Sequence, residues 1–323
     1  MKLHRRELFR LVGGAAALPL LTRTAAALDF PTRPVHIITP YPPGAGPDVI
    51  ARLVAQWLGD RIGQQVVVDN RPGASGNIGT EKAAKSEPDG YTLLIAVSTN
   101  AINQTLYTTL NFDFRADFVP VAGVGRIPFV VVVNANFPAK TVPELIAYAK
   151  ANPGKIDMAT NGVGTGSHAA AELFMMMTGI KFTHVPYKGN YLTDLMGGQV
   201  PLAFSPLSAV SEYIKDGRIR GLGVSTTARS PILPDVPAIA ESVPGYVAEG
   251  WYGLVAPKGT PADVIAKLET ATRASLADAT LQSRLLALGI ESAPMTSAEL
   301  GKFIADEIDK WAKVIKYADI RVN

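Results

Sequence analysis

Short runs of apolar and β-branched residues alternate with helical patterns along almost the whole chain from residue 34 onward. Several runs show no alternation of apolar and polar residues, which is typical of strands that are covered on both faces. This order of strands and helices restricts the fold to an α/β architecture with mostly parallel sheets flanked by helices. The predicted strands are residues 35–39, 65–69, 91–97, 129–133, 156–160, 182–185, 200–204, 219–224 and 252–256.

The segments between these runs contain recognisable helix starts. Apolar residues recur at helical spacing after Asp48. Thr141 opens a capping box with a proline in the first helical turn, and Thr260 and Thr296 begin similar segments nearer the C-terminus. Helices are therefore predicted to begin shortly after these positions.

The length of 323 residues suggests about two domains. No repeat, low-complexity linker or change of composition marks a boundary, so two lobes would share the chain without a flexible tether. Segments 125–133 and 249–257 are the candidates for crossing between them. We predict one lobe from residues 28–125 plus 251–323 and a second lobe from residues 126–250.

The first 27 residues predict an export signal. A basic segment precedes an apolar run at residues 11–21, and three alanines at 25–27 suit a cleavage site. Eleven helical residues reach about 16 Å, too short to cross a hydrocarbon core of about 30 Å. The sequence RRELF at 5–9 resembles a twin-arginine signal, and an ordinary secretory signal fits equally well. We expect cleavage near Ala27 and a soluble periplasmic product.

Charge and cysteine content exclude several classes of partner and site. The first 27 residues hold five Lys or Arg residues and one Glu, which leaves 26 basic and 27 acidic residues in the rest. A near-neutral body has no electrostatic footprint for nucleic acid. The absence of cysteine excludes disulfides, thiolate metal sites and a lipid anchor. We expect no metal and no cofactor, and a monomer by default.

The first loop, residues 41–48 (YPPGAGPD), lies between a predicted strand and a predicted helix. Ligands of parallel α/β sheets bind beyond the carboxyl ends of strands, where helix starts offer free N–H groups with partial positive charge. Small residues here permit the close approach of a carboxylate, and a tight turn capped by Asp48 is the alternative. The candidate ligand contacts are Tyr41, Pro43, Gly44, Ala45, Gly46 and Asp48.

The second loop, residues 161–168 (NGVGTGSH), combines three glycines with two hydroxyl groups ahead of a predicted helix. A dinucleotide fingerprint needs a glycine where Ser167 stands and an acidic residue about 20 positions later, and both are missing. An anion site is the better interpretation. The candidate contacts are Gly162, Gly164, Thr165, Ser167 and His168, and two other loops add Ser75, Ser98 and Asn100.

Catalytic patterns are weak in this chain. His36 and His184 fall within predicted strands, where we expect core positions, and only His168 is expected near a ligand. The histidine spacing fits no zinc pattern, and the Gly-x-Ser-x-Gly nucleophile elbow is absent. A secreted hydrolase would depend on Ser167 beside His168, and adjacent residues are badly placed to act together.

A set of short motifs runs in order along nearly the whole mature chain. They are YPPG at 41–44, VDNRPG at 68–73, GVGT at 162–165, VPYKG at 185–189, DLMGGQ at 194–199, LPDVP at 233–237 and WYGLVAP at 251–257. No single motif is decisive, but the combination resembles the Bug extracytoplasmic solute receptors, the TctC-type binding subunits of tripartite tricarboxylate transporters.

The resemblance implies a two-lobed type II periplasmic binding fold that closes on a small carboxylate and catalyses no reaction. Such receptors hold the carboxylate through backbone amides and bridging waters from the first and second loops, and membrane permease subunits are the implied partners. Tyr187 and Ser205 join the candidate contacts on this basis. Asn100 stands where many members have His, which changes a possible ligand contact. Ser205 stands where many members have Asp, and the loss of that acid favours plain carboxylates over amino acids.

The resemblance leaves the ligand and the downstream partner open. Dicarboxylates, tricarboxylates and aromatic acids are all compatible with the motifs. A receptor that reports its ligand to a two-component sensor is the alternative to a transport receptor.

Overall fold

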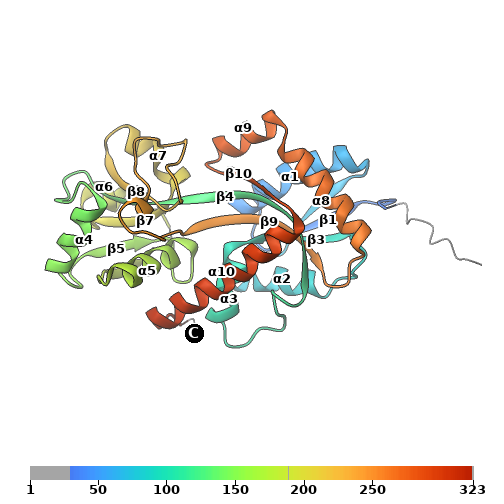
Figure 1. Ribbon diagram of the computed structural model, residues 1–323, viewed down its shortest axis with the longest axis horizontal. Helices are drawn as coiled ribbons and strands as arrows, with labels where there is room; N and C mark the ends of the chain where they lie inside the picture. The colour runs from blue at the N-terminus through green and yellow to red at the C-terminus, as the bar shows by residue number, and fades with distance from the viewer. Residues whose placement is uncertain (1–29, 188, 322–323) are drawn as a thin grey trace, which may run out of the picture.

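Two long neighbouring strands connect the halves of the molecule (Figure 1). β4 (Phe118–Asn134) and β9 (Glu249–Pro257) pair antiparallel, from Phe118 opposite Pro257 to Pro128 opposite Glu249. This computed structural model describes residues 30–187 and 189–321. The two segments predicted to cross between lobes are therefore paired strands. The predicted lobe boundaries fall within these strands and stay a prediction.

The first lobe is built on a mixed sheet with three parallel strands at one edge. The strand order is β2 (Val66–Asn70), β1 (Val35–Thr39), β3 (Thr92–Val97), β9 and β4, with β10 (Glu291–Met295) also paired to β4. The surrounding helices are α1 (Gly46–Ile62), α2 (Asn77–Ala84), α3 (Ser98–Leu106), α8 (Ala262–Leu276) and α9 (Ala279–Ala287). Fully buried side chains such as Ile37, Leu58 and Leu254 form its core.

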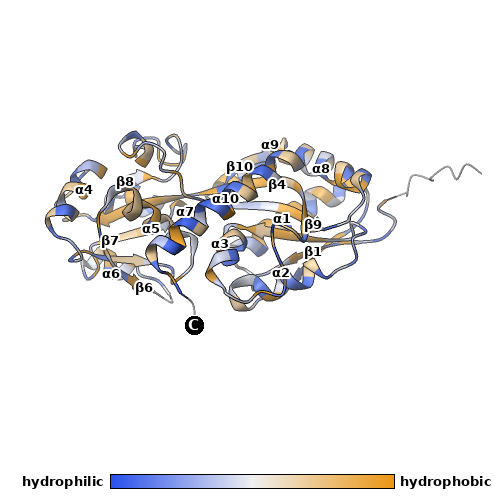
Figure 2. Ribbon diagram, turned by 60° about the horizontal axis from the view of Figure 1, so that its bottom comes forward, coloured by the Kyte–Doolittle hydropathy of each residue, from blue (hydrophilic) through white to orange (hydrophobic). Residues whose placement is uncertain are grey.

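The second lobe repeats this plan at the other end of β4. The strand order is β4, β7 (Leu202–Pro206), β5 (Asp157–Thr160) and β6 (Thr183–Pro186), and β8 (Ile219–Val224) also pairs with β4. Its helices are α4 (Val142–Ala151), α5 (Gly166–Thr178), α6 (Leu192–Gly197) and α7 (Leu207–Lys215). Figure 2 shows these strands as largely hydrophobic.

The nine predicted strands all overlap observed strands, but the sheets are mixed rather than mostly parallel. β4 and β9 must run in opposite directions to carry the chain out to the second lobe and back, so their pairing is antiparallel. The prediction missed β10 and the first half of β4, which is rich in glycine and proline. A Cβ on Gly123 would lie 2.8 Å from the Met295 side chain, so β10 packs where β4 lacks side chains.

The C-terminal helix α10 (Ser297–Ala318) packs against α3 in the first lobe and α5 in the second (Figure 1). Thr296 caps its start in the predicted capping box with Glu299. Glu307 is buried and accepts hydrogen bonds from the indole N–H groups of Trp251 on β9 and Trp311 on α10. Helix α10 thus braces the crossing strands from outside.

Among the described helices, none combines the length and the apolar character that a membrane crossing requires. The predicted export signal, the twin-arginine motif and the cleavage position near Ala27 lie outside the described residues.

Candidate ligand-binding site

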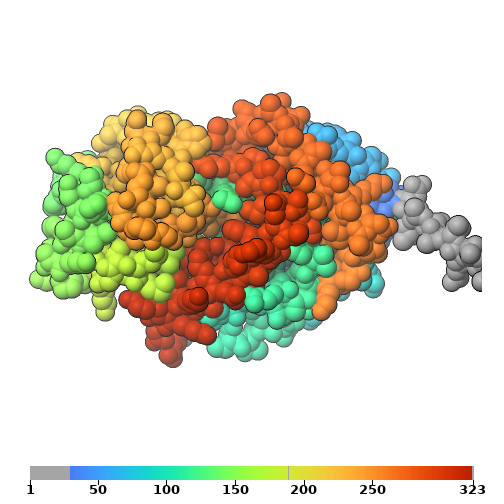
Figure 3. Space-filling model, in the orientation of Figure 1, coloured from blue at the N-terminus to red at the C-terminus, as the bar shows by residue number. Residues whose placement is uncertain are grey.

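A cavity of about 480 Å³ lies between the two lobes, and the space-filling view shows a depression between them (Figure 3). Loops, helix starts and both crossing strands contribute to its walls. The lining residues are Gly44, Gly46, Val49, Ile50, Ser98, Ile127, Phe129, Asn161, Thr165, Gly166, Ser167, Pro206, Ser208, Gly250, Tyr252, Leu288 and Ile290.

Four helices begin at this cavity. Gly46 starts α1, Ser98 starts α3, Gly166 starts α5, and Ser208 lies in the first turn of α7. Each helix follows a strand of its lobe, namely β1, β3, β5 and β7. The first turn of a helix leaves N–H groups without intrahelical partners and carries partial positive charge. The fold therefore directs four anion-attracting helix ends into one cavity.

None of the described residues that line the cavity carries a formal charge. Ile127 and Phe129 on β4 line it, while Arg126 lies on the opposite face of the strand. The Arg126 guanidinium lies 3.4 Å from a carboxylate oxygen of Glu249 and stacks near the Phe303 ring on α10. An anion in this cavity must therefore be held by backbone N–H groups and neutral side chains.

The side chain of Asp48 fixes the conformation of the first loop. Its buried carboxylate accepts hydrogen bonds from the Gly44 N–H at 2.8 Å, from the Asn70 amide at 2.8 Å and from Arg52 Nε at 3.1 Å. Burial opposes ionisation of Asp48, but the hydrogen bonds and the charge of Arg52 outweigh it and lower its pKa. The structure thus gives Asp48 the turn-capping role that the sequence left as the alternative.

The remaining members of the first loop divide between the cavity and the surface. Gly44 and Gly46 line the cavity, whereas Pro43 is exposed and Ala45 half-buried outside the lining. Tyr41 is turned toward α3, with its hydroxyl 2.7 Å from Thr99 Oγ1, and burial raises its pKa.

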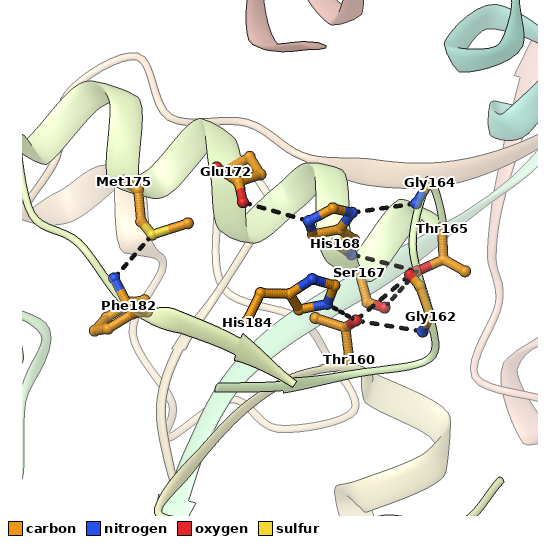
Figure 4. Close-up of polar contacts among 10 residues, drawn as sticks. All are labelled: Thr160, Gly162, Gly164, Thr165, Ser167, His168, Glu172, Met175, Phe182 and His184. Atoms are coloured by element: carbon orange, nitrogen blue, oxygen red, sulfur yellow. Dashed lines mark hydrogen bonds and ion pairs between the residues drawn. The ribbon is translucent and has the colours of Figure 1, made fainter. Parts of the chain in front are cut away.

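His168 holds the second loop (Figure 4). The Gly164 N–H donates to His168 Nδ1 at 3.1 Å, so the imidazole proton resides on Nε2, which lies 3.3 Å from Glu172 Oε1. The Thr165 hydroxyl donates to the Gly162 carbonyl at 2.8 Å and accepts from the His168 N–H. The Gly164 N–H is consequently engaged within the loop rather than free for a ligand.

His184 stacks on His168, with ring centroids 3.9 Å apart and an angle of 11° between the planes. Its Nε2 lies 2.6 Å from Thr160 Oγ1. Burial, together with the neighbouring His168, lowers the pKa of His184 to about 4. The expectation of core positions for the strand histidines is wrong for His36, whose side chain is exposed, because residue 36 faces outward on β1.

Four other candidate contacts lie outside the cavity lining and bond to neighbouring residues. Asn100 is buried, caps the Val97 N–H at 2.8 Å and donates to Thr80. Ser75 accepts from Tyr107, Tyr187 donates to Asp194, and Ser205 accepts from Tyr191. Of the sequence-predicted residues, the cavity brings together Gly44, Gly46, Ser98, Thr165 and Ser167.

Sequence reasoning missed the walls that the crossing strands supply. Tyr252 on β9 is almost fully buried, and its hydroxyl lies 3.1 Å from the position of a Cβ on Gly46. Burial raises the pKa of this phenol, so it stays a neutral hydrogen-bond donor. The tyrosine hydroxyl within the otherwise apolar run at 251–257 could have indicated this contribution to the site.

Comparison with known proteins decides what kind of site this is. The chain matches the family described as "Tripartite tricarboxylate transporter family receptor" over residues 50–320. It is 37% identical to Protein BugT of Bordetella pertussis over 97% of this chain and 98% of that protein. The chain belongs to this receptor family. It is a periplasmic solute-binding protein, and the family consists of receptors rather than enzymes.

Two solved structures show how closely the receptor follows known folds. An R. palustris protein solved with adipate is 37% identical with a TM-score of 0.76, and the match covers 90% of this chain and 99% of that one. MatC from Rhodopseudomonas palustris, with bound malate, is 28% identical with a TM-score of 0.72, covering 88% and 100%. The predicted two-lobed α/β binding fold is confirmed.

Proposed function

We propose that this receptor captures a small organic carboxylate in the periplasm and presents it to the membrane permease subunits of a tripartite transporter. The observation that carries the proposal is the convergence of four helix starts on a cavity whose described lining residues carry no charge. Relatives solved with adipate and malate support a carboxylate ligand. Dicarboxylates, tricarboxylates and aromatic acids are the candidate classes.

The proposed ligand contacts are the candidate residues that line the cavity. They are Gly44, Gly46, Ser98, Thr165 and Ser167. Asp48 and His168 hold the first and second loops in place, and Asn100 holds the start of α3. In this proposal, residues 1–27 direct export by the secretory or the twin-arginine route and are removed near Ala27.

Closure of the lobes is the signal proposed to reach the permease. The hinge would lie in β4 and β9, with residues 28–125 plus 251–323 moving against residues 126–250. Differential affinity of the ligand for the closed arrangement drives such a movement. A permease or a two-component sensor could read this state, and the genes that neighbour the receptor gene separate the two alternatives.

The hydrolase alternative loses its one candidate pair in this geometry. Ser167 Oγ donates to Asn161 at 3.3 Å and lies 3.1 Å from the Thr165 hydroxyl. His168 directs its ring to Gly164 and Glu172 instead.

Thermal melts of the purified receptor with a panel of carboxylates test the proposal, with sugars as negative controls. A ligand at 100 times its dissociation constant adds about 2.7 kcal/mol, which raises the melting temperature by a few degrees. A rise with one class of acid supports the proposal. If denatured, extracted and refolded receptor responds to no carboxylate, the proposal is wrong.

The variant Gly164→Val tests the second loop. Gly164 has φ of +74°, and a Cβ there would lie 2.5 Å from Leu106 Cδ2 on α3 of the first lobe. We expect ligand binding to be lost while unfolding stays cooperative. Gly154→Val is the matched control, because Gly154 has a similar φ of +67° with nothing within 4 Å. Unchanged affinity in Gly164→Val would contradict the assignment of this loop.

A further inference from the structure

The turn that ends α9 in the first lobe lies against the second lobe. Residues 288–291 join α9 to β10, and α7 of the second lobe faces this turn (Figure 1). The Gly289 N–H donates to the Leu286 carbonyl at 2.8 Å. The Ile290 N–H donates to the Leu285 carbonyl at 2.9 Å. With a φ of +72° at Gly289, these bonds form a Schellman motif that fixes the turn to α9. Residues 288–291 are called the strap below.

The strap touches the second lobe through the backbone of Gly289. A Cβ on Gly289 would lie 2.2 Å from Ser208 Cβ and 2.9 Å from Ser208 Cα, at the start of α7. Gly63 and Gly179 end α1 and α5 with similar φ values of +70° and +67°, yet nothing lies within 4 Å of a Cβ there. The missing side chain at Gly289 therefore permits the close approach of α7 as well as the left-handed conformation.

A hydrogen bond joins the strap to the second lobe at another point. The Ser230 hydroxyl, in the segment that follows β8, donates to Glu291 Oε1 at 2.6 Å. This distance is typical of a hydrogen bond between a hydroxyl and a carboxylate. Ser230 is only 1% exposed. The strap thus contacts the second lobe both by close packing and by a buried hydroxyl.

On its other side the strap rests on the crossing strand β4. A Cβ on Gly125 of β4 would lie 2.6 Å from Ile290 Cγ2, and the pairing of β10 with β4 includes Glu291. Ile290 and Ser208 both line the cavity. The strap therefore forms part of the cavity wall where the two lobes meet, and its packing on β4 prevents it from shifting freely away from α7.

We infer that the strap holds the second lobe in the arrangement seen here, through Gly289 and Glu291. Rotation about the proposed hinge that moves the lobes apart on this side would break both contacts, so weakening them should shift the population toward other lobe arrangements. Contacts of this kind lower the free-energy cost of closing on a ligand. The inference concerns the equilibrium between lobe arrangements and holds whichever ligand the cavity takes.

Distances between spin labels on the two lobes test the inference. The chain contains no cysteine, so Asp60→Cys on α1 and Lys150→Cys on α4, both at exposed positions, place one label in each lobe. The labelled receptor is denatured, dialysed and refolded to remove any ligand. We expect the main distance population to match the structure. In Gly289→Ala, the ratio of other populations to this one should rise by at least about tenfold.

Gly63→Ala is the matched control for Gly289→Ala. It places an alanine in the same left-handed conformation at the end of a helix of the same lobe, with free space around the Cβ. We expect Gly63→Ala to keep the distances of the otherwise unchanged receptor. Unchanged distances in Gly289→Ala would overturn the inference, and so would an equal shift in both variants.

Ser230→Ala and Glu291→Ala test the second contact without introducing a clash. Each should raise the ratio of other populations by up to about tenfold. The double variant should show no larger effect than the stronger single one, because both residues act through one hydrogen bond. Ser242→Ala, at an exposed position of the second lobe, should change nothing. Independent effects of the two substitutions, or no effect, would overturn the role of Glu291 in holding the lobes.

Discussion

The first and second loops occupy equivalent places in the two lobes, but different chemistry holds them. Asp48, an ionised carboxylate with lowered pKa, anchors the first loop through Gly44, Asn70 and Arg52. The second loop is anchored by the imidazole of His168, which accepts the Gly164 N–H and faces Glu172. In both, a side chain within the following helix fastens the loop that precedes it.

Both anchors lie outside the cavity lining, so the backbone conformation at the cavity depends on side chains that do not line it. Both loops are rich in glycine and would sample many conformations without an anchor. Asp48 and His168 supply that anchor from buried positions. The two lobes should consequently respond differently to mutation and to acid.

Removal of the first-loop anchor should have the largest effect. Asp48→Ala leaves the Gly44 N–H, the Asn70 amide and Arg52 without their shared acceptor. We expect the free energy of unfolding to fall by about 2–4 kcal/mol in chemical denaturation. Asp60→Ala at the exposed end of α1 is the control and should change it little. A similar loss in both variants would contradict the anchoring role.

Removal of the second-loop anchor should have a smaller effect on stability. His168→Ala leaves one backbone N–H without its acceptor, and we expect a loss of about 1–3 kcal/mol in chemical denaturation. Ligand affinity should fall as well, because residues 165–167 of the same loop line the cavity. His36→Ala, at an exposed strand position, should alter neither quantity. Unchanged affinity in His168→Ala would restrict His168 to a role in folding.

Acid should affect the two lobes at different pH values. His184 has its pKa lowered from 6.5 to about 4, so the unfolded chain binds more protons between these values and stability falls as pH drops through that range. Asp48 has its pKa lowered from 3.8, so its contribution persists above 3.8 and is lost only below that value.

Measuring the free energy of unfolding against pH in the wild type and in His184→Gln checks that the contribution of His184 is lost at higher pH than that of Asp48. Between pH 6.5 and 4, the decline should be shallower in the variant, since glutamine does not titrate. Parallel curves for the two proteins would show that His184 contributes nothing to the acid response.

Several parts of the fold could be predicted because their signals are local. The strand runs, the caps at Thr141 and Thr296 and the loop glycines depend on neighbouring residues only. β10 could not be predicted, because a strand with Pro294 within it forms only where Gly123 and Gly125 let it approach β4. The two crossing segments were located, but the first half of β4 and the antiparallel pairing of β4 with β9 were not predicted.

The sequence by itself determined the α/β class, the glycine-rich loops and their association with helix starts, since these follow from local periodicity and backbone freedom. Only the tertiary structure decided which loop residues reach the cavity. Gly164 and Asp48 share loops with cavity residues, yet their polar groups are used internally. Tyr252, Phe129 and Leu288 join the site from segments far apart in the chain. Their meeting depends on how β4 and β9 bring two lobes together, which no local pattern encodes.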